Sequence, residues 1–385
     1  MRVLVVGAGI GGLAAAVALI DRGHDVEVVE RAESPRETGA AFILWSGGTA
    51  VLHDIGISLD GLGTRLEVLE NRGWDGRRLG RIRVGAATRR FGSPQVCVRR
   101  RDVVRRLAAR LPDGVVEYGK KAVAVTQDGG GARVRLEDGT SRTGDVVVGA
   151  DGGRSVVRGD LHGPAEPRAT GWVTWQGMLT ARADADITGT GLFVVGPEGL
   201  VGMFDAGNHQ VQWWFDHPWR PDEPRPRSVV ADLADRFGHW ADPVPGLLAR
   251  VDDATIGFYP HYGHDVAREW GRGRVTLLGD AAHLMPPTAG QGANQALEDA
   301  WVLARALDHA PDVPAALRDY ERRRARRARL ASRVAMRERA NQYRPRQARM
   351  LPDPVATALF VRWLGLLSDR LAAGPVDGAA GAAPA

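Results

Sequence analysis

Cysteine is almost missing from this sequence: Cys97 is the single one in 385 residues. An internal disulfide and a Cys-rich metal site are therefore excluded, a reducing compartment is favoured, and no metal site is expected. We predict that Cys97, in an apolar strand, is a small core residue rather than a nucleophile. No segment has the ~18–20 uninterrupted apolar residues that cross a bilayer. We therefore expect a cytoplasmic protein with no membrane span.

Lysine is nearly missing as well. Two lysines, Lys120 and Lys121, stand among 51 basic residues, so 49 are arginines, and the formal net charge is +5. An arginine excess raises the question of nucleic-acid binding, and arginines are densest at 322–329. Because these arginines spread around a predicted helix and no aromatic platform or binding module accompanies them, nucleic-acid binding is not expected.

The N-terminus contains a dinucleotide-binding pattern. A buried-strand run at 3–6 leads into Gly7, Gly9 and Gly12, a helical segment follows, and a second strand ends in Glu30. Gly7 permits the tight turn, Gly9 lets the backbone approach a pyrophosphate, and Gly12 allows close packing of helix and strand. The helix N-terminus offers N–H groups to phosphates, and Glu30 is placed to bind a ribose diol. This motif alone does not separate FAD from NAD.

Two later segments also place polar residues after a buried strand. A valine run ends in Asp151 and continues to Arg158, and a second apolar run ends in Asp280. Such strand-end positions are where an α/β sheet binds ligands. The segment after Asp280 contains Pro286, Gly290, Gln291, Gly292 and Asn294. This turn opens a helix and is suited to aim backbone amides at an electron-rich ring.

Taken together, these three motifs resemble the single-component FAD-dependent aromatic hydroxylases. This p-hydroxybenzoate hydroxylase-like family includes salicylate, 6-hydroxynicotinate and urate hydroxylases, tetracycline-inactivating monooxygenases and zeaxanthin epoxidase. The resemblance covers about residues 1–340. It implies an α/β fold with a discontinuous Rossmann-like FAD-binding domain, an inserted and mainly antiparallel substrate sheet, and C-terminal helices. The chain has no counterpart of the thioredoxin-like domain of longer members, which favours the short subgroup.

The resemblance also implies roles for individual residues. Glu30 would bind the AMP ribose, Asp280 the ribityl chain, and Arg100 the flavin, with Arg99 or Arg101 in that role if the register slips by one.

The full predicted cofactor site is Gly7, Gly9, Gly12, Glu30, Arg31, Arg100, Asp151, Arg158, Asp280, Pro286, Gly290, Gln291, Gly292 and Asn294. Asp151 and Arg158 match a segment that the family links to both FAD and the nicotinamide nucleotide. The stretch from Gly290 to Asn294 would supply amides to the flavin pyrimidine edge.

A second dinucleotide fingerprint is absent, which matches a family in which NADPH or NADH docks transiently and has no Rossmann domain of its own. The implied function is hydroxylation or epoxidation of a small aromatic, heteroaromatic or polycyclic substrate by NAD(P)H and O₂, through a flavin C4a-hydroperoxide. The sequence does not choose between a monomer and a homodimer.

Other functions are weighed against this one. A reductase of the geranylgeranyl-reductase type would hydrogenate rather than oxygenate. A flavin halogenase needs a catalytic lysine and a Trp-x-Trp-x-Ile-Pro motif, whereas both lysines here lie within 119–122 and that motif is absent. A flavin-binding sensor without turnover and a nucleic-acid-binding protein are the non-enzyme alternatives.

The substrate side is expected in the middle of the chain, where 171–216 alternates as short strands separated by turns. The family's Trp-Arg-Gly motif reads Trp-Gln-Gly here, so Gln176 is a candidate substrate hydrogen-bonder and a carboxylate substrate is less favoured. Gln212 and Trp214 share one strand face and are further candidates for the pocket wall. His261, in a loop cluster of His and Tyr, is a candidate base for a phenol. No catalytic residue is assigned beyond these candidates.

The predicted domain organisation is discontinuous. We assign 1–70, 95–165 and 272–320 to the FAD-binding domain, 71–94 and 166–271 to the substrate domain, 321–371 to a C-terminal helical region, and 372–385 to a disordered tail.

Overall fold

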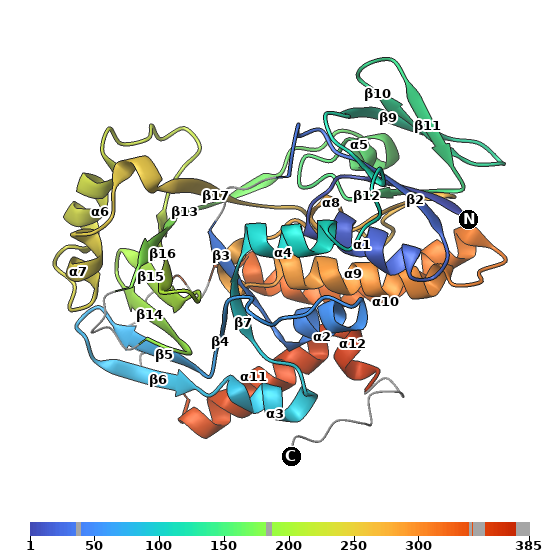
Figure 1. The fold of residues 1–385 in the computed structure, drawn as a ribbon. Helices are drawn as coiled ribbons and strands as arrows, with labels where there is room; N and C mark the ends of the chain where they lie inside the picture. The colour runs from blue at the N-terminus through green and yellow to red at the C-terminus, as the bar shows by residue number, and fades with distance from the viewer. Residues whose placement is uncertain (36–39, 182–186, 339–340, 342–350, 375–385) are drawn as a thin grey trace.

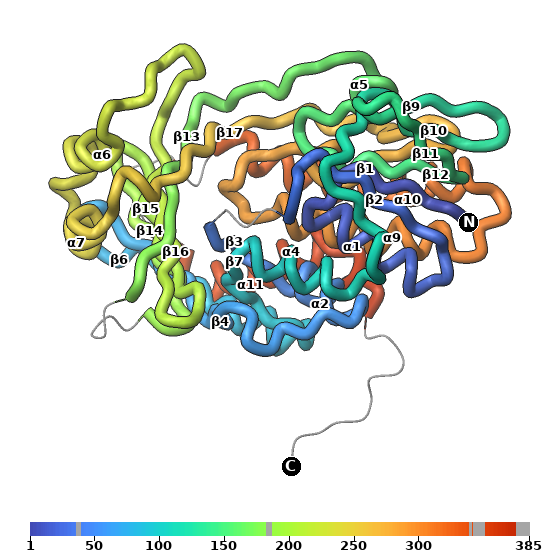
Figure 2. The backbone as a smooth tube through the Cα atoms, turned by 45° about the horizontal axis from the view of Figure 1, so that its top comes forward, coloured from blue at the N-terminus to red at the C-terminus, as the bar shows by residue number. Residues whose placement is uncertain are grey.

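The computed structural model describes residues 1–35, 40–181, 187–338, 341 and 351–374. The chain forms two lobes, one on a parallel sheet and one on a larger, mainly antiparallel sheet (Figure 1). Strands β13 (Arg168–Thr180) and β17 (Gly257–Gly263) pair with each other and run from the larger sheet toward the parallel one (Figure 2).

The first lobe contains a five-stranded parallel sheet in the order β18-β12-β1-β2-β8. Its strands are β1 (Arg2–Val6), β2 (Asp25–Val29), β8 (Val116–Glu117), β12 (Val146–Gly149) and β18 (Val275–Leu277). Strands β12 and β18 are buried along their whole length, which explains their continuous aliphatic sequences. Helix α1 (Ile10–Ile20) packs between this sheet and α9 (Gly292–Leu307), and α10 (Val313–Ala335) packs on α9.

The second lobe contains a seven-stranded sheet in the order β17-β13-β16-β15-β14-β5-β6. Its remaining strands are β5 (Val68–Gly73), β6 (Arg78–Ile82), β14 (Thr190–Gly196), β15 (Gly199–Asp205) and β16 (Gln210–Pro218). All neighbours are antiparallel except β14 and β5. One face carries Trp213 and Phe215 and packs in an aromatic core with α6 (Val229–Phe237) and α7 (Val244–Leu248).

The opposite face of this sheet is turned toward the rest of the molecule. Met178, Phe193, Phe204 and Trp214 pack there in one cluster with Trp45 and side chains of α11. Helix α11 spans Asp353–Leu367.

Smaller elements complete the fold. They are β3 (Ala41–Leu44), β4 (Thr64–Arg65) and β7 (Val96–Arg99) in one sheet, β9 (Ala122–Gln127), β10 (Ala132–Leu136) and β11 (Ser141–Gly144) in another, the helices α2 (Ser46–Asp54), α3 (Gly85–Phe91), α4 (Arg100–Ala108), α5 (Val156–His162), α8 (Asp280–His283) and α12 (Asp369–Ala372), and the 3₁₀ turns η1 (Asp253–Thr255) and η2 (Pro287–Ala289).

The predicted fold class is confirmed: a parallel nucleotide-binding sheet is combined with an inserted, mainly antiparallel sheet and C-terminal helices. Helices α6 and α7 are not predicted from the sequence. The predicted placement of His261 in a loop is wrong, because the residue lies within β17. The domain boundaries remain a prediction, and most of the predicted tail, 375–385, lies outside the described residues. Among the residues that are described, no helix combines the length and apolarity needed to cross a membrane.

Candidate functional site

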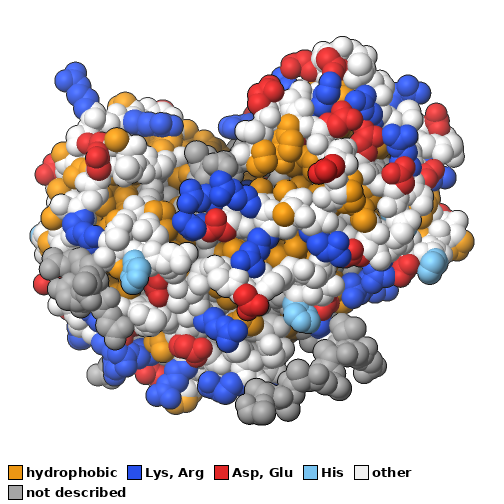
Figure 3. Space-filling model, viewed as in Figure 1, with side chains coloured by type: hydrophobic (Ala, Val, Ile, Leu, Met, Phe, Trp, Pro, Cys, Tyr) orange, Lys and Arg blue, Asp and Glu red, His pale blue; other side chains and the backbone are white. Residues whose placement is uncertain are grey.

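A cleft of about 590 Å³ lies at the carboxyl ends of the parallel strands. It is lined by the β1–α1 turn, the end of β2, the start of α4, residues 118–122, the segment after β12, α8 with the loop that follows, and the start of α9. Four consecutive residues of β17, Tyr259 to Tyr262, line it from the inserted sheet. The molecular surface is hollowed between the two lobes (Figure 3). The cleft therefore joins segments that are far apart in the sequence.

The β1–α1 turn forms one wall of the cleft through its glycines. Gly7 has a φ of +108°, and a Cβ there would lie 2.5 Å from the Ala150 carbonyl oxygen. A Cβ on Gly12 would lie 2.0 Å from the Gly7 oxygen, which explains the tight packing of helix on strand. Gly9 has no atom within 4 Å of its Cβ position and lines the cleft, so its open side is available to a ligand. Gly12 supports the turn from behind and does not line the cleft.

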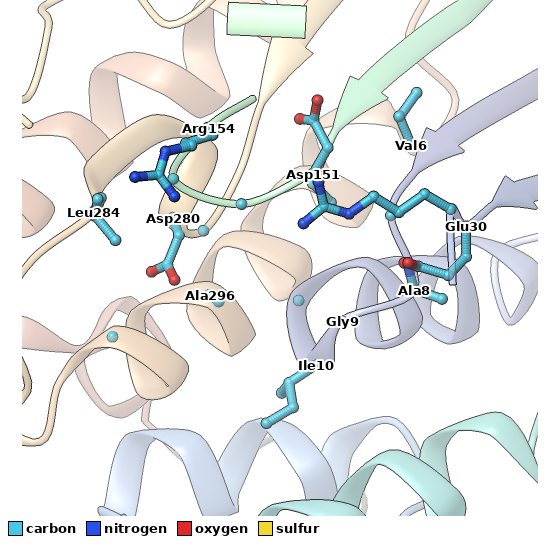
Figure 4. A pocket seen from close by; sticks show the side chains of 18 of the residues that line it. Val6, Ala8, Gly9, Ile10, Glu30, Asp151, Arg154, Asp280, Leu284 and Ala296 are labelled. Atoms are coloured by element: carbon cyan, nitrogen blue, oxygen red, sulfur yellow. The ribbon is translucent and has the colours of Figure 1, made fainter. Parts of the chain in front are cut away.

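Glu30 directly follows β2 and lies beside this turn. Its Oε2 accepts a hydrogen bond from the Ala8 backbone N–H at 2.7 Å, and its Oε1 accepts one from the Ala32 N–H at 2.9 Å. Each carboxylate oxygen can accept a second hydrogen bond, so the side chain is fixed in place and can still bind a diol. In Figure 4, Glu30 and Asp280 lie at opposite ends of the view, with the turn of Ala8, Gly9 and Ile10 between them.

Arg100 begins α4 and lines the cleft, as does Arg31 after β2. The two neighbours of Arg100 do not line it. Arg99 Nε donates a hydrogen bond to Asp102 at 2.7 Å, and Arg101 lies 3.7 Å from the same carboxylate. The structure therefore favours Arg100 over Arg99 and Arg101 as the arginine that faces a ligand.

Asp280 lies at the other end of the cleft and is exposed within it. Its backbone is fixed through the preceding residue, Gly279, whose N–H donates to Asp299 Oδ2 at 2.8 Å. His283 contacts the same oxygen at 2.6 Å. Arg324 contacts the other oxygen of Asp299 at 2.7 Å. Burial opposes ionisation of Asp299, but His283 and Arg324 hold its pKa below the usual range. His283 is thus structural.

Of the two predicted residues Asp151 and Arg158, only Asp151 lines the cleft. Asp151 lines the cleft and caps α5, accepting hydrogen bonds from the Ser155 hydroxyl at 2.5 Å and the Val156 N–H at 2.7 Å. Burial raises the pKa of this carboxyl. Arg158 does not line the cleft: its guanidinium donates to the Ala281 carbonyl at 3.2 Å and so holds α8 against α5. In this structure, Arg158 supports the Asp280 segment rather than facing a ligand.

Only some residues of the segment from Pro286 to Asn294 line the cleft. Pro286 and Gly292 line the cleft, whereas Gly290, Gln291 and Asn294 do not. Asn294 is buried, and its Nδ2 donates to the carbonyls of Ile43 at 3.0 Å and Gly290 at 2.8 Å. Its side chain therefore fixes the turn to β3.

The substrate candidates Gln176, Gln212 and Trp214 lie on the sheet face opposite α6 and α7. Gln212 Nε2 donates to Gln176 Oε1 at 3.3 Å, and Trp214 packs edge-on against Phe193 and Phe204. None of the three lines the cleft as it stands. Cys97 is buried in β7, as predicted, and burial raises the pKa of its thiol.

His261 is the substrate candidate that does line the cleft, but both of its ring nitrogens contact protein groups. Nδ1 lies 2.8 Å from Glu338 Oε1, and Nε2 lies 2.6 Å from Thr174 Oγ1. The ring is 1% exposed. A direct role as a base on a substrate phenol would require these contacts to break.

Several lining residues were not identified from the sequence. Arg154, Tyr118, Lys120 and Lys121 all line the cleft. Arg154 lies inside the Asp151–Arg158 segment without a predicted role, and the other three match no motif. In Figure 4, Arg154 lies next to Asp280, on the side of the view away from Glu30. Trp45 lies behind the cleft lining, and its indole Nε1 is 3.2 Å from the position that a Cβ added to Gly290 would take. This nitrogen is buried and has no hydrogen-bond partner among the described residues. No sequence pattern identifies these residues because chain crossings bring them to the site.

The residues present fit an FAD molecule. The cleft offers an open glycine at a helix N-terminus for a pyrophosphate, a fixed carboxylate for a ribose and a second, exposed carboxylate for a further polar group. Among the residues described, no cluster of three His, Cys, Asp or Glu side chains could hold a metal ion.

Comparisons with known proteins agree with this geometry. A family model described as an FAD binding domain matches residues 1–335. The chain is 35% identical over 353 residues to 3-amino-4-hydroxybenzoate 2-monooxygenase of Streptomyces platensis, covering 89% of this chain and 88% of that one. It is 32% identical over 337 residues to an FAD-dependent urate hydroxylase of Klebsiella pneumoniae, covering 86% and 87%.

A solved structure is similar over nearly the whole length. The structure of Klebsiella pneumoniae HpxO complexed with FAD and uric acid matches with a TM-score of 0.84 and 29% identity, covering 97% of each chain. The glycine turn, the fixed Glu30 and the exposed Asp280 thus lie in a fold that binds FAD in a relative. The chain belongs to the FAD-binding family that contains the FAD-dependent aromatic hydroxylases and monooxygenases.

Proposed function

We propose that this chain is an FAD-dependent monooxygenase that uses NADPH or NADH and O₂ to hydroxylate or epoxidise a small aromatic or heteroaromatic molecule. One observation carries the proposal: a single cleft is lined by the dinucleotide-binding turn and by β17 of the inserted sheet. The names of the relatives support it, since they are hydroxylases and monooxygenases of aromatic and heteroaromatic compounds.

The chain's own residues position and shield the reaction. The N-terminus of α1 would hold the FAD pyrophosphate, Glu30 the ribose, and Asp280 the ribityl chain, with Arg100 at the cleft wall. When bound, FAD supplies the acceptor for the electrons of NAD(P)H and the site at which O₂ reacts. The aromatic face that includes Phe193 would exclude water from that site.

Substrate orientation is assigned to the neutral amides of the inserted sheet. Gln176 and Gln212 are hydrogen-bonded to each other and carry no charge. An amide pair donates and accepts but does not neutralise an anion, so we propose a substrate bound through polar ring substituents rather than through a carboxylate.

The test is substrate-stimulated oxidation of NAD(P)H by the FAD-loaded protein. Phenols, 3-amino-4-hydroxybenzoate, uric acid, other N-heteroaromatics and polycyclic polyketides are screened, and products are analysed by mass spectrometry under isotopically labelled O₂. The expected result is a product that gains one labelled oxygen atom. A hydrogenated product without labelled oxygen would instead establish a reductase. FAD-loaded protein that couples NAD(P)H oxidation to no product would contradict the proposal.

A further inference from the structure

A buried carboxylate just beyond α10 lies against the back of the cleft. Glu338 is 3% exposed, and its Oε1 accepts from Thr170 Oγ1 at 2.7 Å and contacts His261 Nδ1 at 2.8 Å. Its Oε2 accepts from Thr288 Oγ1 at 3.0 Å and Asn341 Nδ2 at 3.3 Å. Four donors therefore occupy the two oxygens, and they come from four separate segments of the chain.

The backbone is turned to place this carboxylate. Glu338 has a φ of +48°, a left-handed conformation that is strained for a residue with a side chain. Its N–H donates to the Ala335 carbonyl at 3.0 Å, so the turn closes onto the end of α10. The hydrogen bonds of the side chain offset the cost of this conformation.

On one side, Glu338 is hydrogen-bonded to Thr288, in the loop that follows α8 and lines the cleft. Thr288 is the middle residue of η2, and the residues before it, Pro286 and Pro287, both line the cleft. The Thr288 hydroxyl is the atom through which Glu338 holds this loop. The loop continues through the left-handed Gly290 to Gly292, which lines the cleft again.

On the other side, Glu338 reaches the inserted sheet through His261. Thr174 Oγ1 lies between His261 Nε2 and a second buried carboxylate, Asp216 on β16. The Thr174 hydroxyl has one proton and two acceptor lone pairs, so it can contact Asp216 and His261 at the same time. In the described part of the chain, the ion pairs of Asp216 and Glu338 are both with His261. The cluster is thus one connected unit from β16 to η2.

We propose that Glu338 is a positioning residue that fixes the FAD-contacting loop Pro286–Gly292 to the inserted sheet, through Thr288 on one side and His261 on the other. The inference requires that FAD occupies the cleft and does not depend on the reaction that follows.

The test compares FAD binding and the visible circular dichroism of bound FAD in the full-length protein and its variants. Thr288→Val keeps the shape of the side chain and removes the hydroxyl, and Glu338→Gln places an amide N–H against groups that donate. Each variant is expected to weaken FAD binding about tenfold, the size of effect of losing a hydrogen bond to a charged group. Each should also change the visible spectrum, because the loop moves relative to the flavin.

Three further variants separate positioning from general stability. Thr288→Ser retains the hydroxyl and should restore FAD affinity and the spectrum. The double variant T288V/E338Q should bind FAD no more weakly than the weaker-binding single variant, because both substitutions remove the same contact between Thr288 and Glu338. The controls T88V, which removes a part-buried hydrogen bond to Gln95, and E70Q, in a buried carboxylate of β5, should lower thermal stability without changing the spectrum.

Wild-type FAD affinity and spectrum in both T288V and E338Q would overturn the proposal. So would losses in these variants that the two controls reproduce, or that Thr288→Ser does not reverse. Because these readouts need no substrate, they are independent of whether hydroxylation is found.

Discussion

Gly9 and Gly12 belong to the same turn, but a methyl group added to each would meet different surroundings. At Gly9 it would enter the cleft with nothing within 4 Å, on an extended backbone that any residue adopts. At Gly12 it would lie 2.0 Å from the Gly7 oxygen. The two glycines therefore serve ligand access and folding, respectively.

We expect Gly9→Ala to leave the free energy of unfolding of the FAD-free protein unchanged and to weaken FAD binding about tenfold or more, equivalent to about 1.4 kcal/mol. Gly12→Ala should destabilise the FAD-free protein by about 2 kcal/mol or more, because backbone must shift to admit the methyl group. Urea unfolding and flavin fluorescence titration measure the two effects. Equal behaviour of the two variants in both assays would contradict this assignment.

Asp216 makes the stability of the protein depend on pH. Burial raises the pKa of its carboxyl from 3.8 to about 6, with His261 opposing the shift and Glu338 adding to it. The folded state therefore binds this proton more tightly than the unfolded chain does. The resulting stabilisation is full below about pH 4 and is lost as the pH rises through about 6.

Asp216→Asn should remove this dependence, because an amide does not titrate. We expect the free energy of unfolding of the variant to rise relative to wild type between pH 4 and pH 7, as measured by urea unfolding at each pH. Circular dichroism without urea confirms that both proteins are folded throughout. A difference that stays constant over this range, or that shifts in favour of wild type, would show that the Asp216 pKa is not raised.

At the scale of elements, a buried ionic network ties the C-terminal helices to the cofactor motif. Arg324 of α10 is fully buried and contacts Asp299 of α9 at 2.7 Å and Asp369 of α12 at 2.6 Å. Asp299 in turn accepts from the Gly279 N–H, next to Asp280 in the cleft. The dense arginines at 322–329 thus include one that supports the cofactor site and are not a simple surface patch.

Arg324→Met should destabilise the protein by about 3–5 kcal/mol, because it removes the fully buried cation between Asp299 and Asp369 and leaves Asp299 with His283 and Asp369 with Arg327. It should also reduce FAD content as purified, since Asp299 no longer fixes the strand end before Asp280. Arg323→Met is the matched control, because this neighbouring arginine is 64% exposed and pairs with Asp319 at the surface. The control should change stability by less than about 1 kcal/mol. Similar losses in the two variants would contradict the role of Arg324.

At the scale of the whole molecule, the cleft joins segments that are far apart in the sequence, from Val6 to Ala296. A ligand that bridges such segments binds the folded state and not the unfolded chain. Stability then rises with the free ligand concentration, by about 2.7 kcal/mol at one hundred times the dissociation constant.

We therefore expect the melting temperature of the protein to rise with added FAD and to fall when FAD is removed. Differential scanning calorimetry at several FAD concentrations checks this, with the Gly9→Ala variant as the control that should respond only at higher concentration. A melting temperature that does not change with FAD concentration would show that FAD does not bridge these segments.

The sequence by itself determined the nucleotide-binding half of this protein. Its strand, glycine turn, helix and terminal Glu30 are adjacent in the chain, so local sterics and helix polarity define the unit without distant contacts. The same holds for the hairpins of the inserted sheet, whose turns lie between alternating strands.

Only the tertiary structure decided which motif residues face the cleft and which support it. Gly12, Arg158 and Asn294 belong to the motifs but support the cleft walls from behind, whereas Tyr118 and Lys120 line the cleft without any motif. The link from Glu338 to His261 and Thr288 spans 77 and 50 residues and has no pattern in the sequence. The physical reason is that side-chain direction and long-range hydrogen bonds depend on how elements pack, and residue spacing along the chain does not encode that packing.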